Sequence, residues 1–385
     1  MNPLAKIKKI RKQRFLILSA GGPQSGIQCI YIAVEGDSWE TLAHAEVPYP
    51  DLVEQLVETL ILTPHPTVSL DQLAWLDQKI SWLFLECAKN ALAHAHKSLR
   101  RPHLIVMNPC TIFNGSSGDN IQAKSWDVSL GDAQLLASAF KVPAISGFAR
   151  HSNLAGGPGR LPLFPGNVKI AKSIEPVSIY LNIGLISHLT IIDNQAMHTV
   201  LDSDVGPGTC LINMAAKEAG CENGFDRDGS YAAKGSVNTG CVEALVALEW
   251  FSRPSPKHAF LQDFVGSYEH PAVKALAPLD KIATLTALTA RSAFEFFRRE
   301  YHHVLPAEVI RVSGGGAHNL TLVDYLLTYF APVQLQSVEE SGIPAALRIP
   351  LALGLTVHEY ILDHPGPWKA GVNPEIEGIG RWVFP

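Results

Sequence analysis

Apolar residues along the chain fall into short and long runs, and together these runs predict an α/β fold. Short runs flanked by glycine or polar residues have the length of buried strands; they lie at 15–19, 29–34, 103–108, 142–148 and 178–192. Longer stretches with apolar residues at helical spacing lie at 70–98, 132–140, 280–300 and 348–362. Strands and helices therefore follow one another along the chain, as in an α/β protein.

The same order of elements occurs twice. A strand, a glycine-rich turn and a second strand are predicted over 15–34 and again over 178–192. Helices follow each pair, and the segment 308–327 has the pattern of a strand, a glycine turn and a helix. This repetition predicts a duplicated α/β fold with two lobes, each built on a mixed sheet. Two such lobes predict an interlobe cleft, where a small ligand usually binds.

The order of elements also divides the chain. Residues 1–13 are basic and predict a disordered tail, with Phe15 to Leu18 too short for a signal sequence. The first lobe is expected over 14–143, completed by 352–385, and the second over 144–351. A Gly/Pro-rich stretch follows the strand predicted over 142–148, and a helical stretch is expected from the segment GFDRDGSYAAKG to Leu248.

Composition restricts the function classes. The 385 residues are 47% apolar and 17% charged, which is typical of a folded chain with a sparsely charged surface. Lys and Arg number 31 against 36 Asp and Glu, a net charge of −5, so a nucleic-acid partner is not expected. None of the six cysteines has zinc-site spacing, which favours free thiols in a reducing compartment. With no apolar run of about 20 residues, we expect a soluble, cytoplasmic protein without a membrane partner.

Three glycine-rich segments are candidate ligand loops: AGGPQSG (20–26), DVGPG (204–208) and SGGGAHN (313–319). Glycine lets backbone N–H groups approach a phosphate closely, and a helix N-terminus adds partial positive charge. None is a Walker A or dinucleotide fingerprint, and each alone is more often a tight turn. Their similar positions in the two halves favour nucleotide binding.

The chain resembles the anhydro-N-acetylmuramic acid kinases, of the two-lobed actin/hexokinase-like superfamily, over almost its whole length. The similar segments are LNIGLISHLT (181–190), DVGPGTCLIN (204–213), DRDGSYAAKGSVN (226–238), IATLTALTARS (282–292), SGGGAHN, SGIPAAL (341–347) and NPEIEGIG (373–380). LAGGPGRLPLFPG (154–166) resembles the glycine-rich loop beside the sugar site of that family. The resemblance implies a ribonuclease H-like duplicated fold, and a homodimer as in many members.

In such kinases ATP and magnesium lie between the lobes. A carboxylate activates water, which opens the anhydro bridge while the sugar oxygen takes the γ-phosphoryl group. The resemblance implies this set of nucleotide-loop residues: Gly21, Gly22, Gly26, Asn182, Gly184, Gly206, Gly208, Gly314, Gly315 and Asn319. ATP and magnesium are therefore implied as cofactors only if kinase activity is retained, and no metal ligand is predicted from the residues themselves.

Departures from the family pattern bear directly on the chemistry. Ser25 and Gln28 stand where the first loop of the family has aspartates, and Gly147 replaces the first aspartate of its DFRxxD segment. Ser152 stands at the position of the catalytic base. A serine hydroxyl is a poor general base and glutamine supplies no charge for magnesium. Further replacements are Asn108 for a histidine, Pro158 for a glutamine and Ile349 for a substrate-contacting carboxylate.

Candidate site residues remain despite these departures. The catalytic candidates are Ser152, His151 and Asp204; Asp204 lies at the start of the second glycine segment, where an aspartate is also common as a turn or cap residue. His151 can act as acid or base near neutral pH, although adjacent residues seldom face one site, so a Ser152–His151 dyad is not expected. The substrate-binding candidates are Arg150, Gly156, Gly157, Arg160 and Ile349.

Three hypotheses follow. The first is a sugar-kinase fold that has lost phosphoryl transfer and reuses its cleft for another small molecule, in lyase, isomerase or cyclase chemistry. The second is a working ATP-dependent anhydro sugar kinase in which other residues replace the lost groups. The third is a non-catalytic protein that binds a small molecule or a protein partner. We favour the first because the replacements at Ser152 and Ile349 leave a less charged pocket.

Overall fold

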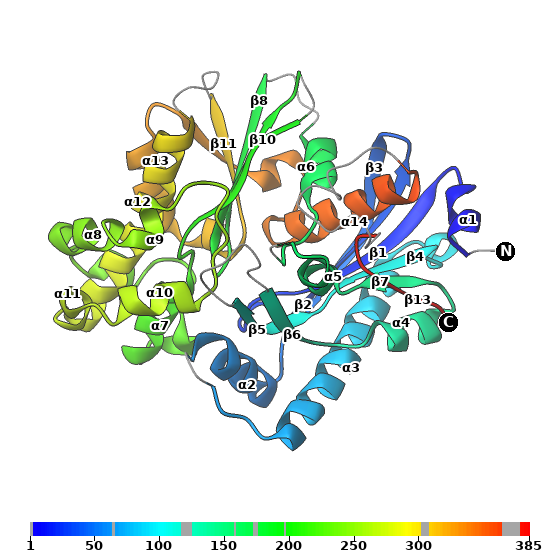
Figure 1. The fold of residues 1–385 in the computed structure, drawn as a ribbon, viewed down its shortest axis with the longest axis horizontal. Coiled ribbons are helices and arrows are strands. Elements are labelled where there is room, and N and C mark those ends of the chain that lie inside the picture. Colours follow the sequence, from blue (N-terminus) through cyan, green and yellow to red (C-terminus); the bar gives the residue numbers. More distant parts are fainter. Residues whose placement is uncertain are drawn as a thin grey trace. The chain divides into compact units, whose positions relative to one another are not determined.

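A computed structural model describes residues 3–63, 66–116, 125–157, 159–171, 176–195, 198–301, 308–363 and 378–385. The chain divides into two compact units (Figure 1). Unit 1 comprises 1–170 and 349–385, and unit 2 comprises 171–348. The prediction of an α/β fold is confirmed, since each unit has a mixed sheet with helices packed on it.

The sheet of unit 1 has a three-stranded antiparallel meander beside two parallel strands. Its strands, in spatial order, are β13 (Arg381–Val383), β7 (Ala144–Ser146), β4 (Leu104–Asn108), β1 (Gln13–Ala20), β2 (Ile27–Glu35) and β3 (Ser38–Val47). β1 pairs antiparallel with β2 and β2 with β3, whereas β1 pairs parallel with β4 and β4 with β7. A separate hairpin joins β5 (Cys110–Ser116) to β6 (Ser125–Leu130).

Helices cover both faces of this sheet, which explains why β1 is apolar at successive positions. Leu16 and Leu18 belong to the core that includes Phe84 of α3, whereas Ile17 contacts Gly354 of α14. The helices of unit 1 are α1 (Pro3–Lys8), α2 (Asp51–Leu62), α3 (Leu70–His94), α4 (Ala133–Phe140), α5 (Phe148–Leu154), α6 (Phe164–Ile170) and α14 (Arg348–Ile361), which begins one residue before the unit boundary.

The sheet of unit 2 repeats the order and directions of the first five strands of unit 1. Its strands, in spatial order, are β10 (His198–Gly206), β9 (Ser187–Asp193), β8 (Val177–Ile183), β11 (Val309–Ser313) and β12 (Gln334–Ser337). β8, β9 and β10 form the antiparallel meander, and β11 and β12 are parallel to β8. The predicted duplication is thereby confirmed, with β8–β12 matching β1, β2, β3, β4 and β7 in order.

Helices α12 and α13 cover one face of the second sheet. Alternate residues of β8, including Ile179 and Leu181, pack with Phe296 of α12 and Leu322 of α13. The helices of unit 2 are α7 (Cys210–Glu218), α8 (Thr239–Val246), α9 (Glu249–Ser252), α10 (Gln262–Tyr268), α11 (Pro271–Lys274), α12 (Pro278–Tyr301) and α13 (Leu320–Phe330).

Three predictions about organisation are corrected. The tail expected over 1–13 contains helix α1, whose Ile7 is buried, and β1 already begins at Gln13. The boundary expected at 143/144 lies at 170/171, because β7 pairs with β4 and β13 in the first sheet. The return to unit 1 lies at 348/349 rather than 351/352.

Candidate functional site

Helix α5 of unit 1 carries three of the predicted site residues, and Gly147 determines where it begins. Gly147 has φ +66°, a left-handed conformation that glycine adopts without strain, and its carbonyl oxygen accepts a hydrogen bond from the His151 amide at 2.9 Å. The segment predicted as a strand up to residue 148 is a strand only at Ala144–Ser146. The sharp turn at Gly147 directs Arg150, His151 and Ser152 onto one short helix.

The glycine-rich segment after α5 folds back over the end of that helix. Ser152 Oγ accepts a hydrogen bond from the Gly159 amide at 3.2 Å. A methyl group on Gly157 would lie 2.6 Å from Ser152 Oγ, and one on Gly159 would lie 3.1 Å from Asn153 Cγ. The absence of side chains at these glycines therefore allows the loop to pack closely against Ser152 and Asn153. Pro158, which the sequence places in this loop, lies outside the described residues.

The remaining substrate-binding candidates differ in exposure. Arg150 and Gly156 are exposed, whereas Arg160 and Ile349 are half-buried. His151 is half-buried, but its Nε2 atom is shielded from solvent and makes no hydrogen bond with any described residue. A methyl group on Gly378 would lie 3.7 Å from His151 Nε2, whereas Ser152 contacts the glycine-rich loop. These contacts give no support to a Ser152–His151 dyad.

A carboxylate that the sequence analysis did not single out lies next to α5. Asp127 Oδ1 accepts a hydrogen bond from Asn153 Nδ2 at 3.0 Å, and its Oδ2 accepts one from Ser129 Oγ at 2.7 Å. Ser129 Oγ also contacts Thr111 Oγ1 at 3.0 Å. The alternation of Trp126, Val128 and Leu130 with polar residues was the available signal for this strand.

The first glycine loop, between β1 and β2, is closed by its own backbone. The Gly21 amide donates to the Gly26 carbonyl at 2.8 Å, and the Ser25 amide donates to the Gly22 carbonyl at 2.9 Å. Gly26 has φ +65°, which favours glycine. Two of the loop's amides are thus used within the turn, and the exposed Ser25 supplies no charge.

The residue two positions after this loop is also uncharged. Gln28 is buried on β2 opposite Ser19 of β1. Asn108 Nδ2 donates to Ser19 Oγ at 3.0 Å. Where the family pattern implies charged groups, this part of unit 1 therefore has neutral hydrogen-bonding side chains.

Most of the predicted nucleotide-loop residues of unit 2 come together at one end of its sheet. The carbonyl of Gly184, in the turn after β8, accepts the Thr209 amide at 2.8 Å. A methyl group on Gly208 would lie 2.9 Å from the carbonyl carbons of Leu185 and Ile186 in that turn. The other contacts at this end of the sheet are Ser313 Oγ with Asn182 Oδ1 at 3.1 Å, Gly314 against Ile183, and Gly206 against Ser292. Gly315 has open space around it.

Asn319, the last residue of the third glycine segment, has two structural contacts. Its Oδ1 accepts the Leu322 amide at 2.9 Å and so caps α13, while its Nδ2 donates to the Asp226 carbonyl at 2.9 Å. The side chain is buried. These contacts account for the asparagine without a ligand.

We expect Asn319→Ala to lower the free energy of unfolding of unit 2 by about 2 kcal/mol, because it removes a helix cap and leaves a buried carbonyl unpaired. Asn319→Ser keeps a capping oxygen and should cost less. Denaturant unfolding of the full chain measures both changes. Equal stability of Asn319→Ala and the wild type would contradict this structural role.

Asp204 is embedded in a polar network rather than placed as a free phosphate or metal ligand. Its Oδ1 contacts His188 Nδ1 at 2.8 Å, and its Oδ2 contacts His258 Nδ1 at 3.0 Å and the Ala259 amide at 2.8 Å. His188 Nε2 contacts Asp202 Oδ1 at 2.8 Å. The contacts therefore favour the structural role that the sequence left open for Asp204.

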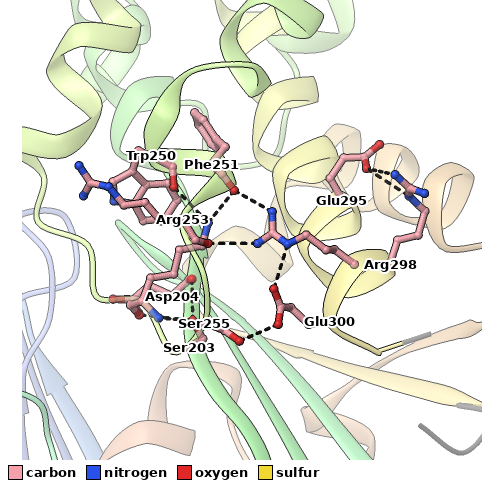
Figure 2. A network of polar contacts seen from close by, with 11 residues as sticks. Ser203, Asp204, Trp250, Phe251, Arg253, Ser255, Glu295, Arg298 and Glu300 are labelled. Atoms are coloured by element: carbon pink, nitrogen blue, oxygen red, sulfur yellow. Dashed lines mark hydrogen bonds and ion pairs between the residues drawn. The ribbon is translucent and has the colours of Figure 1, made fainter. Parts of the chain in front are cut away.

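A buried cation, Lys257, adjoins this network, since its amide donates to Ser203 Oγ at 2.9 Å and its carbonyl accepts the Asp204 amide at 3.1 Å. Figure 2 shows the polar contacts around Ser203, Trp250 and Phe251. Lys257 Nζ donates to the carbonyls of Trp250 at 3.3 Å and Phe251 at 3.0 Å, and lies 4.1 Å from the centre of the Trp250 ring. The Arg299 guanidinium also donates to the Phe251 carbonyl, at 3.1 Å. Burial, with the charge of Arg299 as a further cause, lowers the pKa of Lys257 to about 8.

A cavity of about 700 Å³ adjoins this region of unit 2. Its lining includes Arg291, Glu295 and Arg298 of α12. Arg291 lies 2.9 Å from Glu295 and 3.3 Å from Glu243, and Arg298 lies 2.8 Å from Glu295. Arg291 and Arg298 of the lining are therefore paired with glutamates rather than isolated as positive charges.

Neither a metal centre nor a membrane-spanning helix is found among the described residues. In that part of the chain, no group of three or more His, Cys, Asp or Glu side chains is arranged to hold a metal ion. No helix among the same residues is long and apolar enough to cross a membrane.

The repeated strand order in the two units defines the class as the duplicated ribonuclease H-like, actin/hexokinase-like fold. The family model for anhydro-N-acetylmuramic acid kinase matches residues 13–374. The chain therefore belongs to the anhydro-N-acetylmuramic acid kinase family, as the sequence resemblance predicted.

Curated relatives with that name include two that are identical to the chain at less than a third of the aligned residues. The enzyme of Xylella fastidiosa is 29% identical over 320 residues, covering 82% of this chain and 78% of its own length. The enzyme of Prochlorococcus marinus is 28% identical over 385 residues, covering 96% of this chain and 97% of its own length. Among solved structures, component A of the Acidaminococcus fermentans (R)-2-hydroxyglutaryl-CoA dehydratase is 11% identical to the chain, with a TM-score of 0.43. The match covers 91% of this chain and 99% of that structure's chain.

Proposed function

We propose that this member of the family has lost phosphoryl transfer and uses the α5 region of unit 1 for chemistry on, or binding of, another small molecule. The observation that carries the proposal is the state of Ser152. It stands where the family pattern has the catalytic base, and its Oγ already accepts a hydrogen bond from Gly159. A hydroxyl in this position cannot take a proton from water as a carboxylate does.

The surrounding groups support the same proposal. Gln28 and Ser25 bring no charge for magnesium, and the carboxylate of Asp204 is used by His188, His258 and a backbone amide. Phosphoryl transfer depends on placed charges and a metal ion. Lyase, isomerase or cyclase chemistry can instead depend on shape, orientation and a few hydrogen bonds.

The second candidate is an ATP-dependent anhydro-N-acetylmuramic acid kinase, and the comparisons with known proteins favour it. The family model spans residues 13–374, and the relatives found carry that activity in their names. Asp127, one hydrogen bond from Asn153, supplies a carboxylate near Ser152 that could replace the lost base. This candidate needs ATP and magnesium as cofactors.

ADP release separates the two candidates. With ATP, magnesium and 1,6-anhydro-N-acetylmuramic acid, we expect the wild-type protein to release no sugar-dependent ADP, because a general base contributes roughly 10²–10⁴ to such a rate. The Prochlorococcus marinus relative serves as the positive control in the same assay. Sugar-dependent ADP release by the wild type would overturn the first candidate and establish the second.

A further inference from the structure

Basic side chains gather at one end of unit 1. Six of the nine residues in 6–14 are Lys or Arg, as are three of the five in 97–101, and neither segment contains Asp or Glu. All nine basic residues are exposed except Arg14, which is half-buried. We call this set the basic end; it comprises Lys6, Lys8, Lys9, Arg11, Lys12, Arg14, Lys97, Arg100 and Arg101.

The fold brings the two basic segments together. Strands β1 and β4 are parallel, and Phe15 of β1 pairs with Leu104 at the start of β4. Arg14 Nε donates to the carbonyl of Arg101, 87 residues away, at 2.9 Å, and the His103 amide donates to the Arg14 carbonyl at 2.8 Å. Helix α1 lies at this end of the sheet (Figure 1). The two segments therefore contribute to one surface.

Most of the positive charge of the basic end is not compensated. Three carboxylates pair with its cations: Asp363 with Lys8, Glu35 with Arg11 and Glu40 with Lys12. The other six cations form no ion pair with a described residue. With Asp37 of the β2–β3 turn, four acidic residues stand against nine basic ones, a local charge of +5 in a chain whose total is −5. The remainder of the chain then carries −10, so its charge is strongly segregated.

Two arginines of the basic end are held in place without losing their charge. Arg100 donates from Nε to the Ala95 carbonyl at 3.0 Å and from Nη2 to the Ala93 carbonyl at 2.6 Å. Arg14 donates in the same way to the carbonyl of Arg101. A carbonyl orients a guanidinium but does not neutralise it, and the guanidinium has further N–H donors. Both arginines can therefore bind an anionic partner, and their fixed positions lower the entropy lost on binding.

The composition of this surface favours a protein over a lipid surface or a nucleic acid. None of the exposed large apolar side chains in the described part of the chain belongs to 3–14 or 97–103, whereas stable membrane binding takes a second, apolar contribution. Neither segment has a Phe, Tyr or Trp on which a base could stack. Carboxylates among the cations, such as Glu35 and Glu40, repel phosphates but can pair with basic residues of a protein.

We infer that the basic end binds an acidic segment of another protein, whose Asp and Glu side chains pair with its uncompensated cations. Such a segment is attracted to this end of unit 1 and repelled by the acidic remainder of the chain. No residue of the basic end belongs to α5 or to the glycine-rich loop after it. The inference is therefore independent of the proposed function.

Binding of poly-L-glutamate to the full chain, at about 0.15 M salt where long-range attraction is screened, tests the inference. We expect the wild type to bind, and a variant combining Lys6→Gln, Lys9→Gln and Lys97→Gln to bind about five- to tenfold more weakly, since three ion pairs are lost. The control combines Lys79→Gln, Lys141→Gln and Lys234→Gln. These lysines are exposed and lie outside the basic end, so the control has the same net charge and should bind as the wild type does.

A change of opposite sign provides a second measurement. Glu40 pairs with Lys12, so Glu40→Gln frees that cation and should strengthen binding about twofold. A loss of structure would weaken binding instead. Melting temperatures of all variants check that they are folded.

The outcomes decide both the surface and the partner. No binding of poly-L-glutamate by the wild type would overturn the inference, as would equal weakening by the two triple variants or weaker binding by a folded Glu40→Gln variant. Vesicles of phosphatidylcholine and phosphatidylserine, and duplex DNA, are compared at the same salt concentration. If either binds the wild type more tightly than poly-L-glutamate does, the assignment of a protein partner is wrong.

Discussion

Gly166→Ala should destabilise unit 1 by about 3 kcal/mol, because a methyl group at this position has no room. It would lie 2.6 Å from the carbonyl carbon and 2.8 Å from the Cα of Ala352, and closer still to the carbonyl oxygen. Gly166 is in α6 and Ala352 is in α14. The methyl group would therefore meet the backbone of a second helix, which cannot rotate away as a side chain can. The Gly166 amide also donates to Thr356 Oγ1 at 3.0 Å, which fixes the separation of the helices.

Thermal unfolding measures this effect as a fall of roughly 6–12 °C in the melting temperature of the unit. Gly266→Ala is the matched control, since Gly266 lies inside α10 with open space around its Cα. That variant should be as stable as the wild type or more stable by up to about 1 kcal/mol, because alanine favours helix. A Gly166→Ala variant as stable as the wild type would show that α6 and α14 can separate.

Gly166 has a packing role that the sequence alone does not reveal. The sequence places it at the end of LAGGPGRLPLFPG, which resembles a loop beside a sugar site. The structure explains this glycine by the crossing of two helices that are more than 180 residues apart in sequence. A close approach between distant segments leaves no periodic signal in the sequence.

The hairpins that begin each sheet were predicted because their strands are almost wholly apolar and joined by glycine turns. The third strands, β3 and β10, were missed. β3 is an edge strand with several exposed polar positions, so the segment SWETLAHAEV lacks a clean alternation. Edge strands are stabilised by pairing with their neighbour, which is a long-range contact.

The sequence located the glycine segments but not the contacts that their residues make. The glycine segments were located from composition, and the unit 2 segments do come together at one end of its sheet. The chemistry of Asp204 depends on two histidines, His188 and His258, whose proximity only the fold reveals. Asp127 was overlooked because its neighbour Asn153 lies 26 residues further along the chain.

The network around His188 should make unit 2 less stable as the pH rises from about 6.5 towards 9. Burial alone would lower the pKa of His188, but the charge of Asp202 and hydrogen bonds to Asp202 and Asp204 outweigh it and raise the pKa to about 9. The folded state therefore holds this proton to a higher pH than the unfolded state, whose pKa is about 6.5. The stabilisation is complete below about pH 6.5 and is lost as the pH passes 9, a change of about 3 kcal/mol.

Lys257 acts in the opposite direction at higher pH. Burial lowers its pKa from 10.5 to about 8, so the unfolded state binds this proton more tightly and stability rises with pH between these values. Arg348, whose pKa burial lowers to about 10, stays charged through most of this range. The decline due to His188 should therefore be clearest between about pH 6.5 and 8.

Hydrogen exchange of the β9 and β10 amides in the full chain, corrected for its intrinsic pH dependence, measures this change locally. His188→Gln should remove the decline, at the cost of a lower stability at pH 6.5 because two carboxylates lose their cation. His103→Gln is the control, since burial lowers the pKa of His103 to about 4 and it stays neutral from pH 6.5 to 8. If wild-type stability is constant over this range, or if His103→Gln abolishes the decline as fully as His188→Gln, His188 is not the group responsible.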